Sequence, residues 1–79
     1  MNLDEILKAI RQELGLSQEA MAHELHMSFA TLNRWENKRN LPSRLAMVTL
    51  KEFCIQQGVS ENIIEELNNI RFPMKGTSL

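Results

Sequence analysis

The sequence predicts an all-α fold, a compact five-helix bundle in a single domain. Three observations predict it. Apolar residues recur at helical spacing along most of the chain, and residues that cap helices stand where these stretches begin and end. Alternation of β-branched residues is scarce, and no hairpin dipeptide such as Asn-Gly occurs. With 79 residues, 43% of them hydrophobic, the chain can build one small core.

Composition narrows the class of protein. No apolar run reaches the roughly 18 residues of a membrane span, and the N-terminus has no signal-peptide pattern. The single cysteine, Cys54, cannot form an internal disulfide, which agrees with a reducing compartment. We therefore expect a cytoplasmic protein without a membrane association. The net charge of −1 argues against non-specific coating of nucleic acid, although the distribution of charge matters more than its sum.

The first two helices are expected at residues 3–14 and 18–25. Asn2 begins a capping-box pattern with Glu5, and Gly15 is a suitable stop after the first helix. Ser17 is the expected N-cap of the second helix.

The third helix is expected within residues 28–37, and its two faces differ in chemistry. Leu32 and Trp35 fall on one side, while Ala30, Asn33, Arg34 and Asn37 cluster on the other. The outer set matches the groups that read base edges in DNA: a guanidinium for guanine, amides for adenine and small apolar groups for the thymine methyl. On this stretch alone, an ordinary amphipathic surface helix remains an equal alternative.

The last two helices are expected at residues 44–57, after the cap Ser43, and at residues 61–70, after the cap Ser60. The expected core residues of the fourth helix are Leu45, Val48, Leu50, Phe53 and Cys54. Residues 1–71 would then form the domain, with residues 72–79 as a C-terminal tail that has no helical signal.

Residues 18–37 form one recognisable unit. Apolar residues at Met21, Leu25, Met27, Leu32 and Trp35, with the small Ala22 among them, suit two short helices that cross steeply through a tight turn. This pattern resembles the helix-turn-helix of the Xre/Cro-type, phage-repressor-like family. Leu16-Ser-Gln-Glu, Arg34-Trp-Glu-Asn-Lys-Arg and Leu41-Pro-Ser43 strengthen the resemblance, which spans about residues 10–50. One position departs: His26 stands where the family usually has glycine, in a turn that needs a positive φ.

The resemblance implies a DNA-binding role for particular residues. Gln18 would hydrogen-bond a phosphate. Phe29 and Ala30 would touch thymine methyls, although packing of Phe29 against the second helix is nearly as good an explanation. Arg34 would read guanine or, alternatively, clamp a phosphate, and Asn33 is a weaker candidate for a base or a phosphate. The expected backbone-positioning contacts are Ser28, Thr31, Asn37, Lys38, Arg39 and Asn40.

Two residues of this stretch are expected to have structural roles. The helical period places Trp35 in the core. The resemblance implies that Glu36, which would repel phosphate if it faced DNA, pairs with Arg11. For Arg44, a contact with a phosphate and a solvated position at the start of a helix remain equal alternatives. From Ser28 to Arg44 the sequence has four cations and this one acid, so the remaining charge there is positive.

The function that these features predict is sequence-specific binding of double-stranded DNA by a transcriptional regulator. We expect it to be a repressor that acts as a homodimer on an inverted repeat. The expected dimer surface is the helix at 61–70 together with the tail. A protein-interaction module, such as an antitoxin, is the rival interpretation. No enzyme, cofactor or metal site is expected, because His23 and His26 lack a third ligand and no phosphate-binding loop is present.

Overall fold

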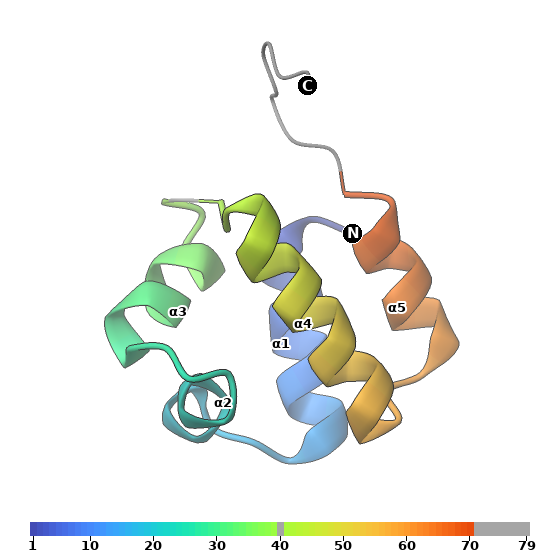
Figure 1. Cartoon of the computed structure of the whole chain (residues 1–79), viewed down its shortest axis with the longest axis horizontal. Helices are drawn as coiled ribbons and strands as arrows, with labels where there is room; N and C mark the ends of the chain where they lie inside the picture. The colour runs from blue at the N-terminus through green and yellow to red at the C-terminus, as the bar shows by residue number, and fades with distance from the viewer. Residues whose placement is uncertain (40, 71–79) are drawn as a thin grey trace, which may run out of the picture.

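The fold is a bundle of five short helices, and a computed structural model describes it for residues 1–39 and 41–70. The helices are α1 (Leu3–Leu14), α2 (Gln18–Glu24), α3 (Phe29–Glu36), α4 (Arg44–Gln57) and α5 (Glu61–Asn68). The described residues contain no strand, so the all-α prediction is confirmed. Figure 1 shows α4 running across the front of α1, with α2 and α3 on one side of it and α5 on the other.

Serine side chains fix where three of the helices begin. The Oγ atoms of Ser17, Ser28 and Ser43 each accept a hydrogen bond from the backbone N–H three residues later, at 3.0, 3.1 and 3.1 Å. Such caps satisfy one of the four N–H groups that a helix start leaves without a partner. Ser60 was expected to act in the same way, but its side chain makes no cap bond; its backbone N–H instead donates to Glu13 at 2.7 Å.

Helix ends are also close to their predicted positions. Gly15 and Gly58 follow α1 and α4 in left-handed conformations, with φ of 69° and 73°, which glycine adopts without steric cost. Helices α2 and α5 end earlier than predicted, at Glu24 and Asn68.

One core is shared by all five helices. Helix α3 packs on α1 and α2, and α5 packs on α1 and α4. The buried apolar residues are Leu3, Ile6, Leu7, Ile10, Met21, Ala22, Leu25, Leu32, Trp35, Met47, Leu50, Phe53, Cys54, Val59, Ile63 and Leu67.

Two predictions about this core are wrong. Leu45 and Val48, which were expected inside, are 75% and 50% exposed, because α4 turns Met47, Leu50, Phe53 and Cys54 inward instead. The argument for α5 as the dimer surface also fails. Its Ile63 and Leu67 are buried, and its Ile64 packs against the core, so the described part of α5 has no apolar excess. The tail lies outside the described residues.

Candidate nucleic-acid interface

The turn between α2 and α3 sets the direction in which α3 points. His26 has φ of 57°, so histidine does occupy the left-handed conformation that was expected at this position. After it, the backbone N–H of Met27 donates to the carbonyl of Ala22 at 3.0 Å, which folds the chain back onto α2. Ala22 and Leu25 are buried, and Met27 packs against the core. The predicted crossing of two short helices over shared apolar residues is therefore present.

Helix α3 divides its residues cleanly between the core and the solvent. Leu32 is fully buried, and Trp35 and Glu36 are only 5% and 2% exposed. Ala30, Arg34 and Asn37 are exposed on the opposite side, and Ser28 and Phe29 are exposed at the start of the helix. Phe29 is 47% exposed, so a substantial part of its ring remains available at the start of the helix. The orientation predicted from the helical period is confirmed.

A buried ion pair holds α3 against α1. The Arg11 guanidinium donates from Nε to Oε2 of Glu36 at 2.9 Å and from Nη2 to Oε1 at 3.0 Å, a two-point geometry that fixes both planes. The hydrogen bond to Glu36 raises the pKa of Arg11. This pair, which the family resemblance implied, also removes the only acid between residues 28 and 44 from the outer surface of α3.

The same carboxylate anchors two residues that were predicted to touch DNA. Gln18 donates from Nε2 to Glu36 at 2.9 Å, and Asn33 donates from Nδ2 to Oε1 of Gln18 at 3.2 Å. Because a carboxylate only accepts, the nitrogen of the Gln18 amide must face Glu36, and its oxygen then faces Asn33. Asn37 completes the series by donating from Nδ2 to Oδ1 of Asn33 at 3.0 Å.

This network constrains what Gln18 and Asn33 can offer to a ligand. Within the protein, the Gln18 side chain donates one of its two amide N–H groups to Glu36 and accepts a hydrogen bond from Asn33 at its oxygen. Its second N–H remains to donate to a phosphate. Both side chains are half-buried. Thr31 is half-buried as well, and its hydroxyl lies 2.9 Å from that of Ser28, so these two predicted contacts also help to cap α3. Sequence reasoning missed these roles because Gln and Asn carry no pattern that separates an internal partner from an external one.

The end of α3 presents cations from a strained turn. Lys38 has φ of 62°, and the backbone N–H of Arg39 donates to the carbonyl of Arg34 at 2.9 Å, as in helix ends that usually carry glycine at the position of Lys38. Sequence reasoning missed this conformation because no glycine marks it. Arg34, Lys38, Arg39 and Arg44 are all exposed. Asn40, the last of the predicted contacts, lies outside the described residues.

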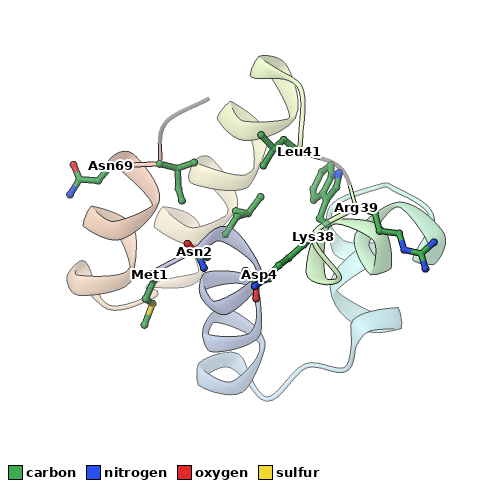
Figure 2. A pocket seen from close by; sticks show the side chains of 10 residues that line it. Met1, Asn2, Asp4, Lys38, Arg39, Leu41 and Asn69 are labelled. Carbon is green, nitrogen blue, oxygen red and sulfur yellow. The ribbon is translucent and has the colours of Figure 1, made fainter. Parts of the chain in front are cut away.

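A surface cavity of about 620 Å³ lies beside this turn. Trp35, Leu41 and Ile70 supply apolar lining, and Asp4 and Lys38 supply charged groups. Figure 2 shows that the Arg39 side chain points away from the cavity and outward from the end of α3. Arg39 borders the cavity, but the outward direction of its side chain places the guanidinium where it can meet an external ligand.

Other kinds of site find less support in the described part of the chain. No group of three His, Cys, Asp or Glu side chains is placed there to hold a metal ion, and His23 and His26 are exposed. Burial raises the pKa of the Cys54 thiol to about 11, and the nearby Glu13 adds to this rise, so the thiol is neutral near pH 7. Among the helices that the structure describes, none has the length and hydropathy of a bilayer span.

These observations define a class of protein: a small helical domain in which a tight turn joins two crossed helices and the second presents cationic and amide groups outward. A family model described as helix-turn-helix matches residues 7–54, which is more than half of the chain. The chain therefore belongs to the family of Xre/Cro/lambda-repressor-like helix-turn-helix domains, whose members are DNA-binding regulatory domains. No curated protein and no solved structure matches it.

Proposed function

We propose that this chain is a transcriptional repressor, not an enzyme, which acts in the cytoplasm and reads an inverted repeat in double-stranded DNA through the outward face of α3. The observation that carries the proposal is the orientation of that face. Arg34 points outward, while Glu36, the one acid in this region, is buried and paired with Arg11. The exposed charges of residues 28–44 are therefore all positive, and a locally positive surface attracts the phosphates of DNA.

Within this proposal the residues have different roles. Arg34 reads guanine through a two-point contact with O6 and N7, and the exposed Phe29 and Ala30 contact thymine methyls. Lys38, Arg39, Ser28 and Asn37 contact the backbone and fix the register, as most protein–DNA hydrogen bonds do. Thr31 and Asn33 support them from the half-buried side of the helix. Gln18 donates its remaining N–H to a phosphate, and Asn40 adds a backbone contact.

A single domain of this size contacts few base pairs, so we propose that two copies bind together. Half-sites would lie about 34 Å apart, one helical turn, which places both copies of α3 in successive major grooves on one side of the DNA. Abundance or a protein partner would then control the regulator.

The experiment that tests this function is selection of bound sequences from a random pool of double-stranded DNA. The proposal predicts enrichment of a motif made of two inverted half-sites, with guanine at one position of each. Recovery of no motif, from protein that is folded by circular dichroism, would contradict it. In that case the alternative, a module that binds a protein partner such as a toxin, would become the better explanation.

A further inference from the structure

Helix α4 is apolar on both of its faces. Its inner residues Met47, Leu50, Phe53 and Cys54 are buried in the core. Its outer residues Leu45, Val48 and Ile55 are 75%, 50% and 63% exposed. Spacings of three and seven residues place these three side chains in one stripe along the helix. Exposed polar residues such as Thr49, Glu52 and Gln56 flank this stripe, which we call the α4 outer face. An exposed apolar stripe with a polar rim has the character of an interaction surface.

We infer that the α4 outer face binds the same face of a second copy of this chain, with the two helices antiparallel. The stripe is self-complementary about residue 50. A two-fold axis there places Leu45 against Ile55 of the second copy and Val48 against the stem of Glu52 of the second copy.

This pairing rests on the proposed function and explains how two copies would share one DNA site. Figure 1 shows α4 across the front of the fold, with α3 to one side. If the two-fold axis of the dimer is perpendicular to α4 and points toward the side on which α3 lies, both copies of α3 lie on the same side of the dimer. Two recognition helices on one side are the arrangement that an inverted repeat requires. A parallel pairing of the α4 helices would not relate the two copies of α3 in this way.

The size of the patch sets the strength of the dimer. Three exposed apolar side chains per copy bury less than the roughly 800 Å² per partner of a standard stable interface. The free dimer should therefore be weak, and binding of both copies to adjacent half-sites should strengthen it.

The first test is sedimentation of the whole chain, without DNA, over a wide range of concentration. The wild-type chain should associate as concentration rises. Leu45→Asp and Ile55→Asp should each raise the dimer dissociation constant by about tenfold or more, since they place a carboxylate in an apolar contact. Both positions are exposed, so folding should survive, and circular dichroism verifies this. Asn62→Asp, at an exposed position on α5, is the matched control and should leave the dimer unchanged.

A second test addresses the antiparallel register. The two-fold axis places Leu45 against Ile55 of the second copy and keeps the two copies of Leu45 about 15 Å apart along the helix axis. In a mixture of Leu45→Cys and Ile55→Cys chains, an added oxidant should therefore cross-link one variant to the other, whereas Leu45→Cys alone should not cross-link. Cross-linking of Leu45→Cys to itself, without cross-linking to Ile55→Cys, would show that the antiparallel pairing is wrong.

Binding to a single half-site separates this inference from the proposed function. With an oligonucleotide that carries one selected half-site, Leu45→Asp should bind as tightly as the wild-type chain, whereas on two half-sites it should bind about tenfold more weakly. If the wild-type chain did not bind the single half-site, that result would contradict the proposed sequence-specific DNA binding but not the proposed dimer. A wild-type chain that stays monomeric, both free and on two half-sites, would overturn the inference and leave the α4 outer face to a different protein.

Discussion

Helices α3 and α4 follow one another in the chain and bury apolar residues in the same core, yet they present opposite chemistry to the solvent. The outer side of α3 carries Arg34, Ala30 and Asn37, while the α4 outer face carries Leu45, Val48 and Ile55. Charged and amide groups remain solvated until a polar ligand such as DNA arrives. An apolar stripe is more stable when another apolar surface covers it. This difference is why we propose that α3 recognises DNA and that α4 associates with a second copy.

The largest expected effect comes from releasing α3 from the scaffold. Glu36→Ala leaves the Arg11 charge and the Gln18 amide without their buried acceptor, so the free energy of unfolding should fall by about 3 kcal/mol. Urea unfolding measures the change. Glu65→Gln, at an exposed position on α5, should change it by less than about 0.5 kcal/mol. Equal effects of the two substitutions would show that the ion pair does not anchor α3.

The outer side of α3 is tested at Arg34, the cation within the helix. Arg34→Ala should weaken binding to a selected operator by about 1–3 kcal/mol and relax the preference at one base position in each half-site. Lys38→Ala should weaken binding to all sequences alike, because a phosphate contact carries no sequence information. Fluorescence anisotropy with a panel of single-base operator variants distinguishes the two patterns. A uniform loss for Arg34→Ala would reassign this residue to a phosphate.

A smaller effect is expected at the two turns that flank α3. His26 and Lys38 both have positive φ, a conformation that costs a non-glycine residue about 1 kcal/mol. His26→Gly and Lys38→Gly should therefore each stabilise the fold, by at most about 0.6 kcal/mol after the greater freedom of glycine in the unfolded chain, roughly 0.4–1 kcal/mol, is subtracted. Only Lys38→Gly should also weaken DNA binding. Loss of stability in both variants would show that the turns are not strained.

The smallest effect at neutral pH concerns the inner side of α4. The pKa of Cys54 is about 11 in the folded chain against 9.0 for an ordinary thiol. The unfolded thiol therefore loses its proton first, the unfolded state binds fewer protons, and stability falls as pH rises from about 9 to 11. Urea unfolding at pH 8 and pH 10 should show the wild-type chain losing more stability than Cys54→Ala. A difference between the two proteins that does not change with pH would contradict this expectation.

The sequence predicted α3 better than α4, and the reason is physical. Polar and apolar residues alternate around α3 at the helical period, so only one orientation buries Leu32 and Trp35 without also burying Arg34. Around α4 both sides are apolar, and the period cannot decide between Leu45 and Met47 as the inward residue. In the structure, α4 packs on α5 with Met47 buried and Leu45 exposed. No local sequence pattern predicts that packing.

The candidate site shows the same limit. The exposure of Arg34 and the burial of Trp35 followed from the helical period, and the positive φ of His26 followed from the family resemblance. The bonds from Gln18 and Asn33 to internal partners did not, because an amide side chain serves a phosphate and a carboxylate equally well. The family resemblance supplied the pairing of Arg11 with Glu36, which neither periodicity nor composition would have found.

The measurement that tests the central claim most directly is fluorescence anisotropy of a labelled operator, titrated with the whole chain at several salt concentrations. If α3 presents its cations to DNA, the logarithm of the binding constant should fall linearly with the logarithm of salt concentration, with a slope near −0.9 for each neutralised phosphate. Arg34→Ala and Lys38→Ala should each make the slope less steep. A wild-type affinity that does not change with salt, or an absence of binding by the folded chain, would contradict the account.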